Sequence, residues 1–209
     1  KKTISGLQVD ETIYGIDMRP ATGQLYALGS SSPLYVLNMA RRAAAPVGMT
    51  SFTPALSGSS FGFDFNSTVV RIRILSNTGQ NLRAHPTTGA IVSTDVALNP
   101  GTPAVSAAAY TNNFAGATST TLYDIDHTTD QLYIQVPPNN GTLVSVGAVG
   151  VNVDDVNGFD IGSSSGRAMG IFSTGSQAKL YWINLTSGSA SVVNTFPEKV
   201  KGFTLGLGF

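Results

Sequence analysis

Three aspartates recur at one position of a repeated five-residue pattern, and they are the first candidates for chemistry in this sequence. The pattern reads Tyr14-Gly-Ile-Asp-Met18, Phe61-Gly-Phe-Asp-Phe65 and Asn157-Gly-Phe-Asp-Ile161, so Asp17, Asp64 and Asp160 are equivalent. If the repeats pack around a common axis, these carboxylates ring a central channel. Converging carboxylates suit Ca²⁺, a hard ion that takes about six to eight oxygen ligands.

A structural interpretation of the same aspartates stands beside the metal site. An aspartate at the end of a strand often hydrogen-bonds the backbone of the turn that follows. A residue that repeats with the architecture is more often part of that architecture, whereas a functional site should interrupt the repeat. We therefore favour the structural role for Asp17, Asp64 and Asp160 and keep a Ca²⁺ site as the alternative.

Arg71, Arg73 and Arg83 form a second group of candidate residues. Residues two apart on a strand point to the same face, which places Arg71 and Arg73 together, and Arg83 lies on the next predicted strand. Grouped guanidinium groups bind carboxylates and phosphates through paired hydrogen bonds. The sequence thus offers an anion site here. The alternative is a polar outer face on which the arginines pair with acids such as Asp95.

Other motifs indicate turns. Residues 162–166 match G-x-S-x-G, but a nucleophile elbow needs a helix after the serine, and residues 167–172 have a strand pattern instead. Asp124, Asp126 and Asp130 cluster around His127 without the Gly and Glu spacing of a calcium loop. We expect ordinary turn chemistry at both places.

The repeat predicts the fold. The glycines of the pattern, with a degenerate copy at Ala108 and a copy in Lys201-Gly-Phe-Thr-Leu205, fall at intervals of 44 to 50 residues. A period in the forties with four short strands per unit is typical of a β-propeller blade. No window sustains a helical apolar period, so we expect an all-β chain with almost no helix.

We predict a β-propeller of about five blades, each of four antiparallel strands. Four complete blades are expected at about residues 13–50, 58–97, 104–150 and 156–197. The remaining pieces, 1–9 and 201–209, would be the outermost and innermost strands of an incomplete fifth blade. Two further strands, from a missing upstream segment or from a protein partner, would then complete that blade by strand addition.

The composition excludes several classes of protein. Charged residues are 11% of the chain, and 12 basic residues balance 12 acidic ones, which argues against a nucleic-acid binder. The chain has no cysteine and two histidines, which excludes disulfides, thiol catalysis and thiolate metal sites. No run of apolar residues is long enough for a transmembrane span. The chain begins at Lys1, so we expect a processed protein or a fragment.

The runs at residues 11–29, 71–83 and 109–113 resemble a bacterial family catalogued as a domain of unknown function. The most specific of them reads Glu11-Thr-Ile-Tyr-Gly-Ile-Asp-Met-Arg-Pro-Ala-Thr-Gly-Gln-Leu-Tyr-Ala-Leu-Gly29. The resemblance covers essentially the whole chain and implies a secreted or periplasmic propeller-like protein. It carries no catalytic residues. Family members have an extra upstream segment, and its lack here implies either a fragment or a gap filled by another chain.

These observations favour a non-enzymatic scaffold, binding module or accessory subunit of a larger assembly outside the cytoplasm, with association to a membrane complex as one form of it. No cofactor is expected under this hypothesis. The alternative is a Ca²⁺-dependent, lactonase-like propeller hydrolase that uses the central aspartates.

Overall fold

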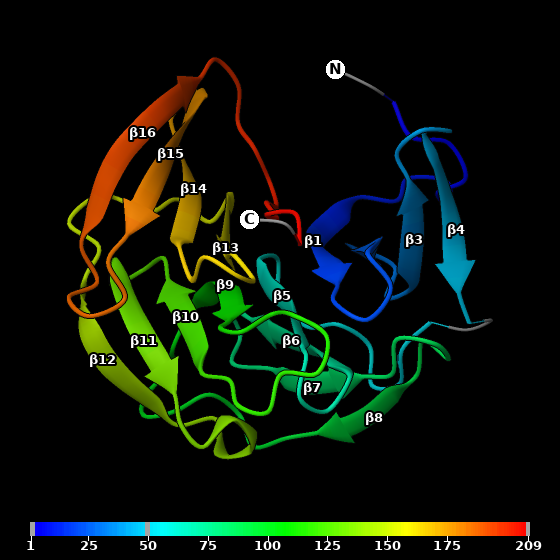
Figure 1. Cartoon of the computed structure of the whole chain (residues 1–209), viewed down its shortest axis with the longest axis horizontal. Helices are drawn as coiled ribbons and strands as arrows, with labels where there is room; N and C mark the ends of the chain where they lie inside the picture. The colour runs from blue at the N-terminus through cyan, green and yellow to red at the C-terminus, as the bar shows by residue number, and fades with distance from the viewer. Residues whose placement is uncertain (1–2, 49–50, 208–209) are drawn as a thin grey trace.

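The chain forms four antiparallel sheets of four strands each, and the computed structural model describes residues 3–48 and 51–207. Figure 1 shows the sheets as blades around a common centre. Blade 1 contains β1 (Ile13–Arg19), β2 (Gln24–Gly29), β3 (Leu34–Asn38) and β4 (Ala43–Val47). Blade 2 contains β5 (Phe61–Asn66), β6 (Arg71–Ser76), β7 (Asn81–Ala84) and β8 (Ile91–Thr94). Blade 3 contains β9 (Val105–Tyr110), β10 (Leu122–Asp126), β11 (Gln131–Gln135) and β12 (Leu143–Ala148). Blade 4 contains β13 (Asn157–Ile161), β14 (Ala168–Thr174), β15 (Gln177–Ile183) and β16 (Ala190–Phe196).

Helix is almost absent from the described residues, as the sequence predicts. The one helix among them is the 3-10 turn η1 (Pro138–Asn140) between β11 and β12. No helix within residues 3–48 and 51–207 is long and apolar enough to cross a membrane.

The innermost strands β1, β5, β9 and β13 pack side by side at the centre, and the repeated glycine makes this possible (Figure 1). A Cβ atom added at Gly62 would lie 2.6 Å from the Cβ of Ala108 on the next blade. A Cβ atom added at Gly15 would lie 2.6 Å from the Cβ of Phe63. The glycine therefore recurs because the inner strands approach too closely for a side chain at this position.

Apolar side chains fill the layers between neighbouring blades. Blades 1 and 2 meet through residues such as Leu28, Phe63 and Ile72, which are at most 5% exposed. Blades 3 and 4 meet through residues such as Ile125 and Phe172, which are fully buried. Because both faces of a blade are covered in this way, its strands carry apolar runs in place of a strict alternation.

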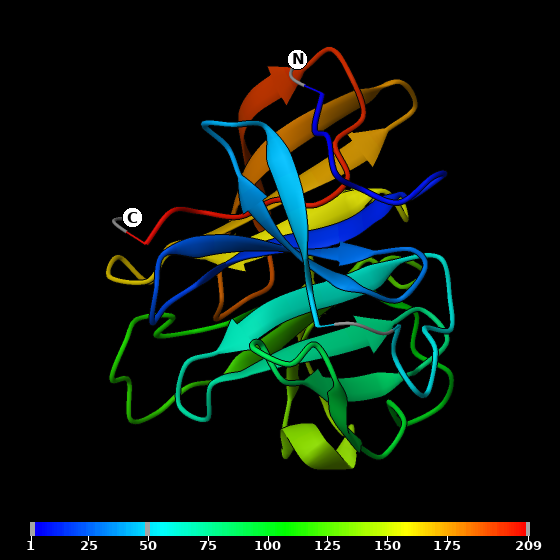
Figure 2. The ribbon, with the colours of Figure 1, turned by 90° about the vertical axis from the view of Figure 1, so that its right-hand side faces the viewer.

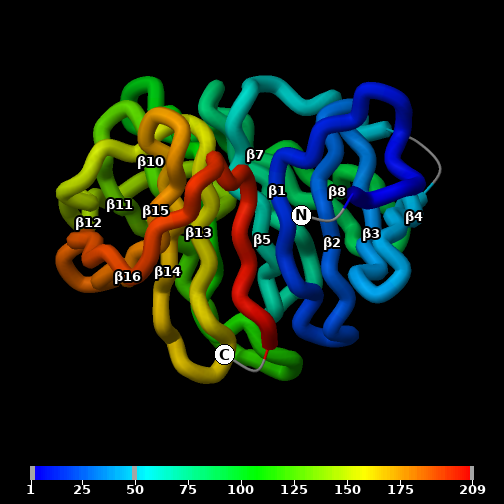
Figure 3. Tube along the Cα trace, turned by 90° about the horizontal axis from the view of Figure 1, so that it is seen from above, coloured from blue at the N-terminus to red at the C-terminus, as the bar shows by residue number. Residues whose placement is uncertain are grey.

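The prediction of about five blades is wrong, because the structure has four. Residues 202–207 match the inner strand of the repeat, but they form no sheet among the described residues. They run instead as a single strap, the C-terminal strap, between β13 and β1 (Figure 3). Its amide at Gly202 donates to the carbonyl of Asn157 at 3.1 Å. The strap therefore fills the gap between blades 4 and 1 by itself, and no further strands pack outside it among the described residues.

The N-terminal piece does not join the strap either. Ser5 pairs with β4 on the outer edge of blade 1, where the amide of Ala44 donates to the carbonyl of Ser5 at 2.8 Å. Ile4 and Leu7 pack on the apolar face of blade 1 that includes Tyr35. In Figure 2 the N-terminal segment descends from the top of the view, and the C-terminal strap passes blade 1 and runs toward the left edge. Residues 1–2 and 208–209 of the predicted fifth blade lie outside the described residues.

Candidate functional sites

The structure brings the three repeated aspartates together at the centre of the molecule. Asp17 lies on β1, Asp64 on β5 and Asp160 on β13, and one carboxylate oxygen of each lies within 4.8 Å of the others. Their side chains are buried, with exposures of 1%, 1% and 2%. The repeat thus predicted this cluster, which we call the aspartate cluster.

Each carboxylate in the aspartate cluster accepts a hydrogen bond from the backbone of the following inner segment. The amide of Phe65 donates to Asp17 Oδ2 at 2.8 Å, and the amide of Tyr110 donates to Asp64 Oδ1 at 3.1 Å. The amide of Leu205 in the strap donates to Asp160 Oδ2 at 2.5 Å. The aspartates thus connect one blade to the next. The structural role that the sequence suggested is present, but the bonds join blades and do not cap the turn within a blade.

Thr204 completes this arrangement from the strap. It occupies the aspartate position of the last copy of the repeat, and its hydroxyl lies 3.0 Å from Asp160 Oδ2 and 3.1 Å from Asp17 Oδ1. A hydroxyl next to two carboxylates places a hydrogen-bond donor where a fourth acid would add repulsion. The strap therefore connects blade 4 to blade 1 through one threonine.

Burial and mutual repulsion disfavour ionisation of the cluster. Burial raises the pKa of Asp17 and that of Asp64 well above the usual value, and the neighbouring carboxylates raise both further. Burial raises the pKa of Asp160 to about 6, against hydrogen bonds from Leu205, Thr204 and Ile161 that lower it. The cluster accordingly favours bound protons well above the pH at which free aspartates lose them.

The oxygens of the aspartate cluster do not match what Ca²⁺ requires. Of their six carboxylate oxygens, Asp64 Oδ2 is the one that accepts no hydrogen bond within residues 3–48 and 51–207. Ca²⁺ takes about six to eight oxygens, and here the backbone amides already use most of those available. The geometry suits a proton-bearing structural centre better than a calcium site.

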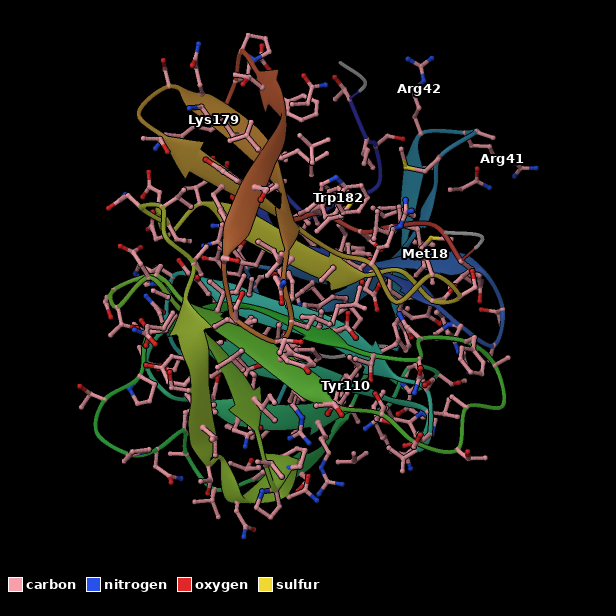
Figure 4. All side chains as sticks on the ribbon, turned by 60° about the vertical axis from the view of Figure 1, so that its left-hand side comes forward. Met18, Arg41, Arg42, Tyr110, Lys179 and Trp182 are labelled. Carbon is pink, nitrogen blue, oxygen red and sulfur yellow. The ribbon has the colours of Figure 1, made fainter. Side chains whose placement is uncertain are left out.

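The three arginines named from the sequence line one cavity between blades 2 and 3. We call it the arginine pocket, and its volume is about 240 Å³. It is lined by Asn66, Val69, Arg71, Arg73, Arg83, Tyr110, Pro137, Pro138 and Asn139. Tyr110, which Figure 4 labels, enters from the end of β9. The alternation along β6 thus placed Arg71 and Arg73 on the correct common face.

Arg73 forms the rigid floor of the arginine pocket. Its side chain is 2% exposed, and its Nε donates to the hydroxyl of Tyr110 at 3.2 Å. Nη1 donates to Asp95 and to Asn81 at 2.7 Å each, and Nη2 donates to Asn139 at 2.8 Å. All three guanidinium nitrogens are therefore held, which fixes the group and the side chains around it.

Asp95 balances part of the positive charge, as the alternative interpretation of the arginines expected. It accepts from Arg83 Nε at 2.8 Å as well as from Arg73. Partial burial alone would raise the pKa of Asp95, but hydrogen bonds from Arg83, Ser93 and Arg73 lower it below the usual value. Asp95 thus pairs with two of the three arginines, and Arg71 has no carboxylate partner among the described residues, so the arginines keep a net positive charge.

The arginine pocket lies where the repeat is interrupted. Asp17 pairs across its sheet with Tyr26, and Asp160 with Met169, whereas Asp64 pairs with Arg73. On blade 3 a tyrosine, Tyr110, takes the place of the aspartate. The sequence patterns did not identify Tyr110 and Asn139 as site residues. The signal for Tyr110 was present, because it is the residue at which the degenerate copy loses its acid.

A second acid lies buried beside this pocket. Asp124 on β10 is fully buried, and neither of its oxygens has a hydrogen-bond partner among the described residues. Burial raises its pKa well above the usual value, although the charge of Arg73 opposes this. Burial thus disfavours the ionised form of Asp124, so this acid offsets the positive charge of the arginines less than Asp95 does.

The serine-rich motif and the acids Asp126 and Asp130 serve turns, as expected, whereas Asp124 is buried on β10 and does not. Residues 162–166 join β13 to β14 in a tight turn, with the amide of Gly166 donating to the carbonyl of Gly162 at 2.9 Å. A strand follows this turn, so it lacks the helix of a nucleophile elbow. Asp126 accepts the amides of Thr128 and Thr129, and Asp130 accepts the amide of Val153, so these acids serve separate turns.

Solved structures share the fold at low identity. Hydrazine synthase of Kuenenia stuttgartiensis matches with a TM-score of 0.53 and 11% identity, over 95% of this chain and 53% of that one. The Dos1 propeller matches with a TM-score of 0.51 and 14% identity, over 100% of this chain and 55% of that one. The glutaminyl cyclase of Myxococcus xanthus matches with a TM-score of 0.52 and 16% identity, over 83% and 75%. This chain spans about half the length of the first two, and the likeness shows a β-propeller fold and nothing finer.

Family membership follows from the sequence as a whole. No curated protein is detectably similar to this chain. A family described as a domain of unknown function, DUF4394, matches residues 1–204. The resemblance seen in the sequence is thereby confirmed, and the chain belongs to the DUF4394 family.

Proposed function

We propose that this chain is a non-enzymatic, extracytoplasmic binding module that holds a small anion in the arginine pocket. The observation that carries this proposal is the arginine pocket itself, which three arginines line while one carboxylate, Asp95, pairs with two of them. Arg71 has donors that no carboxylate of the described residues uses, and an anionic ligand can accept charge-assisted hydrogen bonds from them. The low charge of the chain and its wealth of Gly, Ser, Thr and Asn support a location outside the cytoplasm.

The rival function is a Ca²⁺-dependent hydrolase built on Asp17, Asp64 and Asp160. The convergence of the three carboxylates favours it. The backbone amides that occupy their oxygens speak against it, because each blade would lose its connection to the next if calcium took those oxygens. We therefore assign these aspartates to the architecture.

A protein partner belongs to the proposal. Residues 203–207 form no backbone–backbone hydrogen bond with other described residues. Side chains bind the amide of Leu205 and the carbonyls of Leu205 and Leu207, and the other backbone groups of the strap are open to a partner between blades 4 and 1. Such an edge is a template for contact with another chain. We propose that an accessory role in a larger assembly, including one at a membrane, uses this side and leaves the arginine pocket free.

Titration calorimetry with inorganic phosphate at constant ionic strength tests the binding function. We expect saturable binding that Arg71→Gln weakens at least about tenfold, since a charge-assisted hydrogen bond contributes about 1.5–3 kcal/mol. Arg41→Gln is the matched control, because Arg41 is exposed on the β3–β4 turn, far from Tyr110 (Figure 4). If no anion binds in a way that depends on Arg71, the proposed function is wrong.

A further inference from the structure

The unsatisfied donors of the arginine pocket lie on its outer arginines. Arg71 donates from Nη1 to the carbonyl of Val70 at 2.9 Å, and its Nε and Nη2 have no hydrogen-bond partner among residues 3–48 and 51–207. Arg83 uses Nε and Nη2 for Asp95 and Ser93, and its Nη1 has no such partner. Arg73 has every nitrogen engaged, so a ligand reaches Arg71 and Arg83 first.

The edge that Nε and Nη2 of Arg71 present has the geometry of a carboxylate receptor. Two parallel N–H groups on one planar guanidinium match the two oxygens of a carboxylate. The Nη1 atom that fixes Arg71 is held by backbone carbonyls, so the guanidinium is oriented and keeps its full charge. A carboxylate can therefore be bound at Arg71 without displacing any acid of the protein.

Besides the arginines, the lining combines the polar residues Asn66, Tyr110 and Asn139 with three apolar residues that a bare inorganic ion would not use. Val69 is 52% exposed at the rim, and Pro137 and Pro138 form the wall contributed by blade 3. Apolar side chains that face a cavity gain when an apolar part of the ligand covers them. The cavity of about 240 Å³ also exceeds what one small ion fills.

We infer that the ligand of the arginine pocket is an organic monocarboxylate with an apolar body. Its carboxylate accepts hydrogen bonds from Arg71, and Arg83 Nη1 adds a further donor. Its apolar body covers Val69, Pro137 and Pro138. This inference rests on the proposed anion-binding function and deepens it by naming the class of ligand.

Calorimetric titration with benzoate, hexanoate, acetate, benzamide and inorganic phosphate tests the inference, with ionic strength held constant because salt screens the charges. We expect benzoate and hexanoate to bind at least tenfold more tightly than acetate, with roughly two- to fourfold gained per buried methylene. Benzamide has the shape of benzoate without its charge and should bind at least tenfold more weakly.

Matched variants locate the two halves of the ligand. Arg71→Gln should weaken the binding of benzoate at least tenfold. Arg71→Lys keeps the charge but loses the paired donors, so its affinity for benzoate should lie between those of wild type and Arg71→Gln. Val69→Ser should weaken the binding of benzoate severalfold and leave the affinity for phosphate unchanged. Arg41→Gln should change neither, and circular dichroism confirms that each variant is folded.

The outcomes separate this inference from the function on which it rests. Phosphate binding that depends on Arg71, with benzoate no tighter than acetate, overturns the inference and keeps the anion-binding function. Benzamide binding as tightly as benzoate also overturns the inference. Absence of any binding that depends on Arg71 overturns both.

Discussion

The oxygens of Asp17, Asp64 and Asp160 differ in one respect that mutation can exploit. Asp64 Oδ1 accepts the amide of Tyr110, while Asp64 Oδ2 accepts no hydrogen bond from the described residues. In the other two aspartates both oxygens accept hydrogen bonds. Asp64 is therefore the member of the cluster whose charge can be removed while its contact with the next blade is kept.

Asp64→Asn should raise the free energy of unfolding at pH 7.5 by about 1 kcal/mol, since an amide donor near two carboxylates replaces a repelling charge. Asp10→Asn, at an exposed aspartate, is the control. Urea denaturation measures both. An Asp64→Asn protein that is less stable than wild type at pH 7.5 would contradict the account of the cluster.

The pH dependence follows from the same raised pKa values. The folded state holds protons that the unfolded state loses near the ordinary aspartate pKa of 3.8, so the stabilisation is complete below that pH. It is lost as pH rises through the folded pKa, which is about 6 for Asp160 and higher than usual for Asp17 and Asp64. Wild type should therefore lose stability between about pH 4 and neutral pH, and Asp64→Asn should lose less; urea midpoints at both pH values measure this. Equal losses in the two proteins would show that the cluster does not titrate as described.

Calcium should leave thermal unfolding unchanged. A site filled at a hundred times its Kd would stabilise the protein by about 2.7 kcal/mol, which is roughly 5–11 °C for a chain of this size. Because backbone amides occupy the oxygens of the cluster, we expect no such shift in differential scanning calorimetry. A shift of that size, abolished by Asp64→Asn, would restore the calcium-dependent hydrolase.

At the scale of the element, the strap of residues 202–207 is the part that local patterns could not describe. The copy of the repeat around Gly202 correctly predicted an inner position for this segment next to β13. This copy describes an inner strand alone. Whether a full blade forms outside it depends on three further strands, about which the pattern of the inner strand says nothing. The N-terminal piece lies on blade 1 because its apolar residues Ile4 and Leu7 pack there, a tertiary contact that local patterns do not encode.

The same distinction holds for the candidate sites. The spacing of the repeat was enough to predict that Asp17, Asp64 and Asp160 converge, and the alternation of β6 was enough to group Arg71 with Arg73. Asn139 could not be foreseen, because it comes from the β11–β12 connection of another blade. Contacts between blades depend on the loops, whose paths no periodicity encodes.

Thr204→Val should lower the free energy of unfolding by about 1–2 kcal/mol. The hydroxyl lies within hydrogen-bond distance of Asp17 and Asp160; it donates its one hydrogen to one of them and accepts from the other when that carboxyl group is protonated. Each lost hydrogen bond costs roughly 0.5–1.5 kcal/mol. Thr186→Val, at an exposed threonine on the β15–β16 turn, should be neutral. Urea denaturation compares the two, and equal stability would mean that the strap does not hold the ring closed through Thr204.

At the scale of the whole molecule, the contacts between neighbouring blades differ from one pair of blades to another. Within the described part of the chain, blades 1 and 4 meet through the strap and the aspartate cluster, whereas blades 2 and 3 meet directly and hold the arginine pocket between them. The repeat is most regular where carboxylates connect the blades and is broken where arginines and Tyr110 gather. The molecule thus separates a structural centre from a binding site.

One nuclear magnetic resonance titration tests this separation most directly, with phosphate and then calcium added to the same ¹⁵N-labelled protein at constant ionic strength. We predict that phosphate shifts the Nε–H signals of Arg71 and Arg83 and the amide of Asn139. The amides of Met18 and Leu205, which donate to Asp17 and Asp160, should stay unchanged with either ion. Shifts at Met18 and Leu205 on adding calcium, with none at the arginines on adding phosphate, would contradict the account.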